Sequence, residues 1–488
     1  MYSLNQALSK TLVVCCSVTL YFTGIQAVCA SPEPRAYYVS HSGNDKNTGR
    51  KNTPFKTLQK INSISLHPGD SVLLKGGQTF EGTLQMHADD SGLPKRSIVI
   101  SSTGKNAATI NGGDLSGLVI DSAKYIRISH LSIKGSGRKN GNIYNGVLLN
   151  RCSHISIADL TINGFQKAGL LVYSSTHIDI RHVHAFENGY AGISVDSEYG
   201  KNDTRQIYIA DCLAENNPGD PSNFNNHSGN GIVVGNSRHV TIDYCVATNN
   251  GWDMPRIGNG PVGIWCYEAD NIKIRYCISY ANKTAKGADD GGGFDFDGGV
   301  TNSIIEHCLS YNNYGSAFGI FQYKGAGPWH DNVIRNNISE NDGEVSAAHA
   351  GVYIWNSTGD ATQFKNFSFC NNIVYNKMGS VIHYADGQDE RNAFNFYNNI
   401  FVAKDDMVSG KMGGDIFNGN TWWSLAGGFN SDSIKDFKTW VAKTGKEQKN
   451  GKITGKNVNP HLTGAGNTTL KDPHKLTAFI AAYRKMKK

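Results

Sequence analysis

A short strand-like pattern recurs along most of the chain and restricts its fold more than any other feature. Segments such as "IDIRHVHA", "IYIADCLA" and "VTIDYCVA" alternate apolar with polar residues and end near turn-forming residues. One shared column of the repeat contains Leu131, Leu160, Val183, Cys212, Cys245, Cys277, Cys308, Asn337, Asn372 and Asn399. The spacing between these positions varies from 23 to 35 residues, as expected where loops differ in length but strand cores stay in register. This repeat without helices predicts an all-β solenoid, a parallel β-helix.

The repeat also explains the cysteines, of which the chain has 10. Four of them occupy the shared column in successive coils, from Cys212 to Cys308. Neighbouring coils lie about 4.8 Å apart, so a disulfide between adjacent positions would need unusual geometry. We therefore expect a buried stack of reduced thiols, rather than disulfides or a metal site. Where the column changes to Asn, we expect an internal ladder of side-chain amides.

Segments at both ends of the repeat are typical of caps. The segment "YYVSHSGNDKNTGRKNTPFKTLQKI" predicts an opening strand, a polar loop and a short amphipathic helix that covers the first coil. From Met412 the repeat fades, and "DPHKLTAFIAAYRKMKK" predicts a terminal helix. The expected organisation is a signal peptide (1–30), an N-terminal cap with the first coils (31–110), the β-helix (111–411) and an irregular or helical C-terminal cap (412–488).

The first thirty residues are typical of a secretory signal. Lys10 supplies a positive charge, an apolar stretch follows, and small residues allow cleavage after Ala30. A membrane anchor is the alternative, but Thr, Ser, Gly and Gln dilute the stretch and no basic run follows it. No later segment is apolar enough to span a bilayer. We expect a monomeric protein that is secreted to the periplasm, the cell surface or the medium.

The charge of the chain is mildly basic, with a formal net charge of +6. The excess is spread along the sequence rather than clustered. It permits a polysaccharide partner, including an acidic one, but does not require it. The sequence contains no basic stripe with interleaved aromatic residues, so nucleic acid is not an expected partner.

A second set of strands predicts the face that carries chemistry. Alternation places Ile193 and Val195, Ile232 and Val234, Val262 and Ile264, Phe294 and Phe296, Phe318 and Ile320, and Val352 and Ile354 inside. One outward column then contains Ser194, Val233, Gly263, Asp295, Gly319 and Tyr353. The next outward column contains Asp196, Gly235, Trp265, Asp297, Phe321 and Trp355.

The stretch "GADDGGGFDFDGGV" concentrates carboxylates on this face. Asp295 and Asp297 are expected to point outward from one strand, with Asp289 and Asp290 in the loop that enters it. The flanking glycines leave room beside Asp295. Candidate platforms for sugar rings are Trp265, Phe321, Trp355 and Tyr353, although loops could cover the tryptophans instead. Asp196 lies three coils away and is a candidate for a more distant substrate subsite.

Two reaction types fit such a cluster. Carboxylates at i and i+2 of a strand stand about 6.5–7 Å apart at Cα, a spacing that suits the acid and base of an inverting glycoside hydrolase. Asp297 and Asp295 would then be acid and base in an unassigned order, with Asp290 in support and no cofactor required. Alternatively, the clustered carboxylates bind Ca²⁺, and a nearby Lys or Arg abstracts a proton in β-elimination. A non-catalytic glycan-binding or adhesion protein is a further alternative.

The motifs resemble the pectin-lyase-like right-handed β-helix proteins and, within them, the pectate lyases of polysaccharide lyase family 9. The opening "YYVSHSGNDKNTG…PFKTLQKI…PGDSVLLKGG" is similar to that family's N-terminal region, and "ADDGGGFDFDGGVTNSIIEHCLSYNN" is similar to its calcium segment. The resemblance implies a right-handed β-helix and a Ca²⁺ site formed by Asp289, Asp290 and Asp295.

The chain departs from that family at two positions. The family's catalytic Lys corresponds to Gly319 here, and the nearest lysine is Lys324. A further calcium-ligating Asp of the family corresponds to Gly263. The sequence therefore favours an enzyme that cleaves a polysaccharide, with hydrolysis slightly preferred over lysis. In the lyase alternative, Lys324 or an unplaced Arg would be the base.

Overall fold

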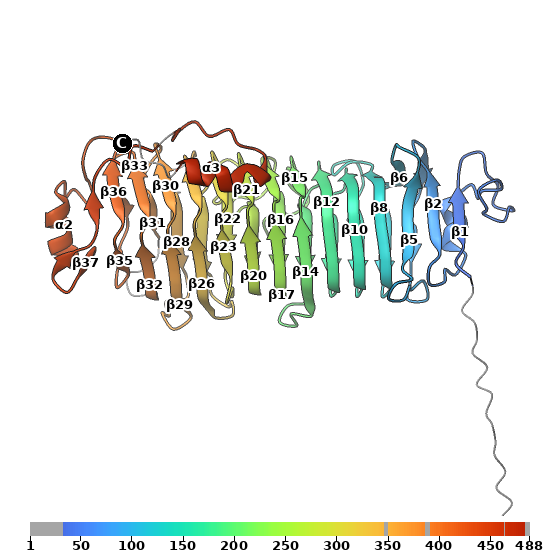
Figure 1. Cartoon of the computed structure of the whole chain (residues 1–488), viewed down its shortest axis with the longest axis horizontal. Coiled ribbons are helices and arrows are strands. Elements are labelled where there is room, and N and C mark those ends of the chain that lie inside the picture. Colours follow the sequence, from blue (N-terminus) through green and yellow to red (C-terminus); the bar gives the residue numbers. More distant parts are fainter. Residues whose placement is uncertain (1–32, 346–349, 386–390, 463, 484–488) are drawn as a thin grey trace, which may run out of the picture. The chain divides into compact units, whose positions relative to one another are not determined.

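The computed structural model describes residues 33–345, 350–385, 391–462 and 464–483. The chain divides into two units, Met1–Glu33 and Pro34–Lys488. The predicted signal peptide lies outside the described residues. In the second unit, parallel strands stack coil upon coil, which confirms the predicted parallel β-helix (Figure 1).

One face of the solenoid is a parallel sheet of twelve strands. Along the chain its strands are β4 (Leu84–Met86), β7 (Leu118–Asp121), β9 (Val147–Asn150), β11 (Ala168–Tyr173), β13 (Ala191–Asp196), β16 (Asn230–Gly235), β19 (Val262–Tyr267), β22 (Gly292–Phe296), β25 (Phe318–Gln322), β28 (Val352–Asn356), β31 (Ile382–Tyr384) and β34 (Val408–Ser409). We call it the twelve-stranded sheet.

The remaining faces form one sheet of 25 strands. They are β1 (Ala36–Val39), β2 (Ser71–Lys75), β3 (Thr79–Glu81), β5 (Ile98–Thr103), β6 (Ala108–Gly113), β8 (Lys124–Gly135), β10 (Ser153–Asn163), β12 (Thr176–Phe186), β14 (Thr204–Ala210), β15 (Leu213–Glu215), β17 (Ser237–Asp243), β18 (Val246–Thr248), β20 (Asp270–Arg275), β21 (Ile278–Tyr280), β23 (Ile304–Glu306), β24 (Leu309–Tyr311), β26 (Trp329–Arg335), β27 (Ile338–Glu340), β29 (Phe364–Cys370), β30 (Ile373–Asn376), β32 (Asn392–Tyr397), β33 (Ile400–Ala403), β35 (Ile416–Asn418), β36 (Thr421–Ser424) and β39 (Lys456–Asn457).

Paired asparagines turn the coils at recurring corners. In the pairs that begin at Asn216, Asn249 and Asn312, the first residue adopts a left-handed backbone conformation, with φ of 52°, 52° and 54°. Asn tolerates this conformation better than most residues with a side chain. The second residue of each pair points inward and bonds along the stack. The frequent "NN" of the sequence therefore has two structural roles.

The inward asparagines form two ladders of side-chain hydrogen bonds. The first ladder runs through Asn188, Asn217, Asn250, Asn282 and Asn313 and ends on Asp342, with amide-to-oxygen distances of 2.7–3.1 Å. The second ladder runs through Asn337, Asn372, Asn399 and Asn420 and ends on Glu447. It continues the column of Cys212, Cys245, Cys277 and Cys308, whose thiols are free and buried. The predicted thiol stack and the predicted asparagine ladder are both confirmed.

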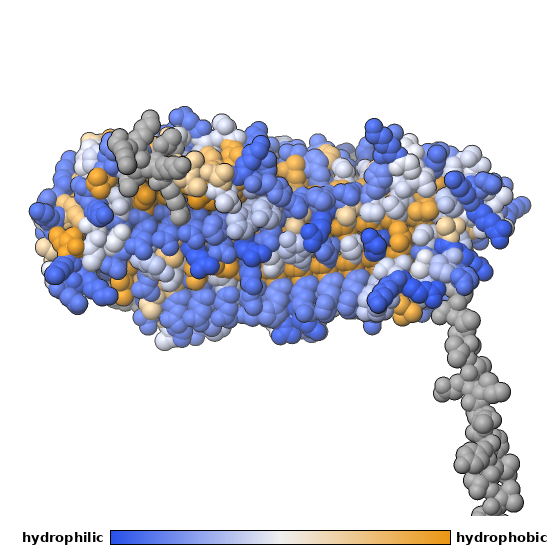
Figure 2. Space-filling view, viewed as in Figure 1, coloured by the Kyte–Doolittle hydropathy of each residue, from blue (hydrophilic) through white to orange (hydrophobic). Residues whose placement is uncertain are grey.

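The hydrophobic core fills the interior of the coils. Inward residues such as Ile193, Ile232, Phe294 and Val352 are fully buried. The face seen in Figure 2 is mostly hydrophilic, with apolar areas along its middle.

Helices cover the two ends and part of one side. Helix α1 (Leu58–Asn62) is capped by Thr57, whose hydroxyl accepts from the Lys60 amide at 3.2 Å, and buries two apolar residues in the predicted N-terminal cap. The regular coils continue past residue 411 to β36, and α2 (Phe437–Thr444) follows them. The hairpin of β37 (Gln448–Lys449) and β38 (Lys452–Ile453) comes next.

The C-terminal segment returns along the solenoid, in addition to the end cap that the sequence predicted. After a short 3-10 turn, η1 (Pro473–Lys475), helix α3 (Leu476–Tyr483) packs on the outer side of β18, β21, β24, β27 and β30 (Figure 1). Buried Glu340 anchors this segment, because it accepts hydrogen bonds from the Thr468 amide at 2.7 Å and the Tyr483 hydroxyl at 2.6 Å. Within the described residues, no helix has the length and hydrophobicity needed to span a membrane.

Candidate functional site

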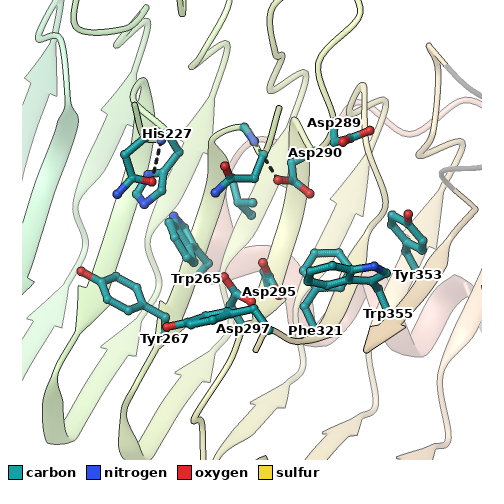
Figure 3. A pocket seen from close by; sticks show the side chains of 15 residues that line it. His227, Trp265, Tyr267, Asp289, Asp290, Asp295, Asp297, Phe321, Tyr353 and Trp355 are labelled. Carbon is teal, nitrogen blue, oxygen red and sulfur yellow. Dashed lines mark hydrogen bonds between the residues drawn. The ribbon is translucent and has the colours of Figure 1, made fainter. Parts of the chain in front are cut away.

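A pocket of about 640 Å³ opens over the middle of the twelve-stranded sheet. Its floor is formed by β19, β22, β25 and β28. Residues of the loops that enter β16, β19 and β22 form part of its rim. The lining side chains include all four aspartates of the glycine-rich stretch: Asp289, Asp290, Asp295 and Asp297 (Figure 3). The structure thus brings the predicted carboxylate cluster into one cavity.

The register of β19 differs from the sequence alignment by two residues. Trp265, rather than Gly263, pairs with Asp295, and Cys266 is buried opposite Phe296. Gly263 lies at the start of the strand, where a Cβ atom would stand 2.0 Å from the Ser279 hydroxyl. Gly263 thus has no space for a side chain, and the inward residues that align with Phe294 and Phe296 are Ile264 and Cys266 rather than Val262 and Ile264. The predicted pairing of Trp265 with Asp297 was therefore wrong.

Asp295 lies in the floor and is 3% exposed. A Cβ on Gly319 would stand 2.7 Å from its Oδ1 atom, so this glycine makes the room that the sequence predicted. Oδ1 is buried and has no hydrogen-bond partner among the residues that the structure describes. Burial raises the pKa of Asp295 well above its usual range, and the neighbouring charge of Asp297 raises it further. The environment therefore favours the neutral form of Asp295, and its side chain is buried, whereas the sequence predicted an exposed one.

Asp297 and Asp290 are half-buried and approach the pocket from different elements (Figure 3). Asp297 directly follows β22, and its Oδ1 accepts from the Gly298 amide at 2.8 Å. Asp290 belongs to the entering loop, and its Oδ2 accepts from the Gly260 amide at 2.8 Å.

The pKa values of these two carboxyls are also raised. Burial raises the pKa of Asp290 to about 7, with a contribution from Asp297. Burial and the charge of Glu268 raise the pKa of Asp297 to about 6. Near pH 6–7 the pair therefore holds one proton for much of the time, the state needed for joint acid and base catalysis.

Aromatic side chains form the walls of the pocket. Trp265 is 3% exposed and its Nε1 donates to Asn230 at 3.0 Å. Phe321 packs edge-to-face against Tyr353 and Trp355, with ring centroids 5.2 and 6.4 Å apart. All four predicted platforms line the pocket, and Tyr353 and Trp355 are half-buried. Tyr353 and Trp355 expose ring surface that can stack against a sugar, whereas Trp265 and Phe321 are buried within the wall.

Asp196 does not line the pocket but supports one of its walls. Its carboxylate accepts from Asn236 at 2.9 Å and from the Tyr267 hydroxyl at 3.2 Å. Tyr267 lines the pocket and its ring occupies the space beside Gly235. Asp196 therefore holds Tyr267 in place, and its role as a more distant substrate subsite stays a prediction.

Lys324 is not in the pocket either. Strand β25 ends at Gln322, and the turn that follows carries Lys324 to the surface, where its amide donates to the Ser357 hydroxyl at 3.0 Å. None of the lining residues is a Lys or Arg. The base predicted for the lyase alternative is thus displaced from the aspartates.

The predicted calcium ligands do not converge. Asp289 is exposed, Asp290 is bonded to the Gly260 amide and Asp295 is buried beside Gly319. The described residues contain no group of three or more His, Cys, Asp or Glu side chains arranged to hold a metal ion. A site for Ca²⁺ in the family-9 manner does not fit this arrangement.

Several lining residues were not predicted from the sequence: Asn226, His227, Asn259, Tyr267 and Tyr323. Tyr267 was missed because of the register of β19. The others lie in loops or just after a strand, where periodicity carries no information. The length of the loops before β16 and β19 was the available signal, because long loops on one sheet face often build a site.

Comparison with known proteins places the repeat in a described family. A family model for the right-handed beta helix region matches residues 145–401. This range contains the whole floor of the pocket.

Individual relatives match over different extents. A lacto-N-biosidase of Bifidobacterium longum is 38% identical over 85 residues, which span 17% of this chain and 5% of that protein. A GH136 lacto-N-biosidase of Eubacterium ramulus has a similar structure, with a TM-score of 0.52 and 18% identity over 74% of this chain and 67% of that one. A mannuronic acid specific polysaccharide family 6 lyase from the human gut microbiota gives a TM-score of 0.52 and 14% identity over 83% and 89%. These structural likenesses concern the fold.

Proposed function

The chain belongs to the right-handed beta helix family, and we propose that it is a carbohydrate-active enzyme that hydrolyses glycosidic bonds. The observation that carries this proposal is the group of three aspartates that line one pocket and whose pKa values are all raised by burial, so that an acid and a carboxylate can coexist there near neutral pH. Hydrolysis of a glycosidic bond needs one carboxylic acid and one carboxylate.

Asp290 and Asp297 are the pair we assign to the reaction. Both are half-buried and face the pocket from different elements, whereas one oxygen of Asp295 is sealed from solvent. One of the pair donates a proton to the leaving oxygen, and the other acts as base or nucleophile. The raised pKa of Asp295 favours its neutral form, which limits the negative charge beside Asp297.

Hydrolysis is favoured over β-elimination by the lining of the pocket. Elimination requires a base that abstracts a carbon-bound proton and a cation that neutralises the uronate. The lining contains neither a Lys nor an Arg, and the carboxylates do not converge on a metal position. The segment similar to a lacto-N-biosidase points in the same direction, because that protein's name is that of a glycosidase.

A carbohydrate fits the pocket in size and chemistry. Its volume of about 640 Å³ lies within the range of small-molecule sites, roughly 300–1,000 Å³. Aromatic walls provide stacking surfaces, and the carboxylates and amides provide hydrogen bonds. A bounded cavity favours a short oligosaccharide or the end of a chain over a long stretch of polymer. The reaction would take place outside the cytoplasm if residues 1–30 act as a signal.

The reaction type can be decided with one digestion. The purified protein is incubated with the para-nitrophenyl glycoside of lacto-N-biose and with a panel of neutral and uronate-rich polysaccharides, with and without chelator. We expect a released nitrophenol or new reducing ends, insensitive to chelator and without absorbance near 235 nm. A chelator-sensitive rise at 235 nm would reveal an unsaturated product and overturn hydrolysis. Carbohydrate binding without turnover would support the adhesion alternative.

A further inference from the structure

A buried asparagine fixes the proton position of a histidine in the pocket. Asn230 is fully buried and lies between Trp265 and His227. The indole Nε1 of Trp265 stands 3.0 Å from the Asn230 side chain, and the Val262 amide stands 3.4 Å from the same atom. An indole N–H and a backbone N–H can only donate. The Asn230 atom that faces them must therefore be the oxygen.

The opposite side of Asn230 must then be its NH₂ group. This group stands 3.0 Å from the carbonyl oxygen of Tyr190 and 3.0 Å from Nδ1 of His227. Because a carbonyl only accepts, one hydrogen goes to Tyr190 and the other to His227. Nδ1 of His227 is therefore the acceptor, and a neutral ring must carry its proton on Nε2. If the side-chain amide of Asn230 were flipped, its NH₂ group would face the indole N–H of Trp265, and two donors would oppose each other.

The ring of His227 is neutral and held in place. Burial and the charge of Arg256 lower its pKa to about 4. The ring packs edge-to-face on Trp265, with centroids 4.7 Å apart, in the wall of the pocket (Figure 3). Within the described part of the chain, Nε2 has no hydrogen-bond partner. It is also not one of the unpartnered side-chain atoms that are closed off from solvent. The N–H is thus available to a ligand.

The loop that carries His227 is pinned at both ends. Buried Asp220 receives a hydrogen bond from Lys167 at 2.5 Å, and its own amide donates to the Ser228 hydroxyl at 3.0 Å. The His227 carbonyl accepts from Asn223 at 3.1 Å. The donor therefore needs little reorganisation when a ligand arrives.

We propose that His227 is a substrate-positioning residue whose Nε2–H, fixed by Trp265 through Asn230, donates a hydrogen bond to an acceptor oxygen of the bound carbohydrate. The proposal rests on the proposed function of the pocket and deepens it. The carboxylates on the floor accept hydrogen bonds or release a proton, whereas His227 is a permanent neutral donor. The substrate must then present a hydroxyl, ether or carbonyl oxygen to His227, and a group that can only donate is rejected there.

The proton position is tested without substrate. In protein labelled with ¹⁵N-histidine, the signals that disappear in His227→Gln belong to His227. In the wild type we expect the pattern of a ring protonated on Nε2, unchanged from pH 5.5 to 8. Asn230→Asp replaces the donor by a carboxylate, so the proton should move to Nδ1. A wild-type ring protonated on Nδ1, or one that titrates in this range, would overturn the proposal.

The role in binding is tested by kinetics on the nitrophenyl glycoside, or on the panel substrate that is cleaved. His227→Phe keeps a ring but loses the donor, and we expect KM to rise about 10-fold. His227→Gln retains an N–H donor and should restore KM to within about 3-fold of the wild type. Exposed His239→Gln is the matched control and should change nothing.

The outcomes separate the two proposals. Equal KM values for wild type, His227→Phe and His227→Gln, at unchanged melting temperature, would refute the positioning role. A wild type that cleaves no carbohydrate would refute the proposed function instead, while the labelling experiment would still report the proton position.

Discussion

The asparagine ladders and the pocket floor both bury polar side chains, but they satisfy them to different degrees. Asp342, at the end of the first ladder, accepts from the side chain and backbone of Asn313 and from Ser339. Among the described residues, Asp290 accepts one hydrogen bond, from the Gly260 amide, and one carboxyl oxygen of Asp295 accepts none. Yet burial raises the pKa of Asp342 and of Asp290 alike to about 7. A raised pKa alone therefore does not mark a functional carboxyl; the missing partners do.

The largest expected effect is a loss of catalytic rate when a carboxyl group of the pocket is replaced. Asp297→Asn removes a proton-transfer group and should lower kcat by about 10²–10⁴-fold. Its melting temperature should not fall, because no ion pair of Asp297 is present among the described residues. Initial rates and a thermal melt check both statements. Retained turnover would remove Asp297 from the mechanism.

A ladder residue should show the opposite behaviour. Asn372→Ala deprives the side chain and backbone amides of Asn337 of their acceptor, at 3.0 and 2.9 Å. Buried donors without partners cost roughly 1–3 kcal/mol each, so we expect a loss of about 2–4 kcal/mol in the free energy of unfolding. Denaturant melts measure it. KM and kcat of the folded protein should be unchanged. A loss of activity without a loss of stability would contradict the view that the ladder stabilises the fold and takes no part in the reaction.

The end of the first ladder should make stability depend on pH. The folded-state pKa of Asp342 lies above its unfolded value, so this group stabilises the fold fully below about pH 4. That contribution is lost as the pH rises towards about 7. Asp342→Asn keeps an acceptor for Asn313 without a charge, and should stabilise the protein at pH 8 by about 1–4 kcal/mol. Melts of both proteins at pH 5 and pH 8 test this; the gain should shrink at pH 5.

The pocket carboxyls should shape the pH dependence of the rate. With pKa values of about 6 and about 7, Asp297 and Asp290 predict a bell-shaped profile of kcat/KM with its maximum between pH 6 and 7. The rate should fall about tenfold per pH unit beyond either limb. A flat profile from pH 5 to 8 would contradict the assignment of this pair.

The smallest expected effect belongs to the thiol stack. Cys245→Ala removes a fully buried sulfur that contacts two carbonyls, and should cost about 1–2 kcal/mol of stability with no change in activity. Cys212→Ala, one coil earlier in the same column, should have a similar effect on stability. A cost near zero for both would argue against tight packing of the column.

The repeat made the fold predictable, since columns such as Leu131 to Asn399 require only that strand cores stay in register. The site was predictable where glycines and aspartates stand out of an alternating strand. It was not predictable in β19, because "VGIWCY" is apolar at almost every position and alternation cannot decide which side chains point inward. The contact of Gly263 with Ser279 decides it, and that is a contact between distant parts of a coil. His227 lies in a loop, so its place depends on Asp220 and Asn230.

The first ladder also affects how the protein can change during evolution. Asn217, Asn250 and Asn282 each close a coil immediately before a loop that builds the pocket, the loops that carry His227, Asn259 and Asp290. The side-chain hydrogen bonds of each of these asparagines are formed within the stack, at the point where the chain enters the loop. A loop can therefore be lengthened, shortened or exchanged between one ladder asparagine and the next strand while the stack remains intact. The coils thus act as a constant scaffold, and new substrate specificities can arise by replacing one loop at a time.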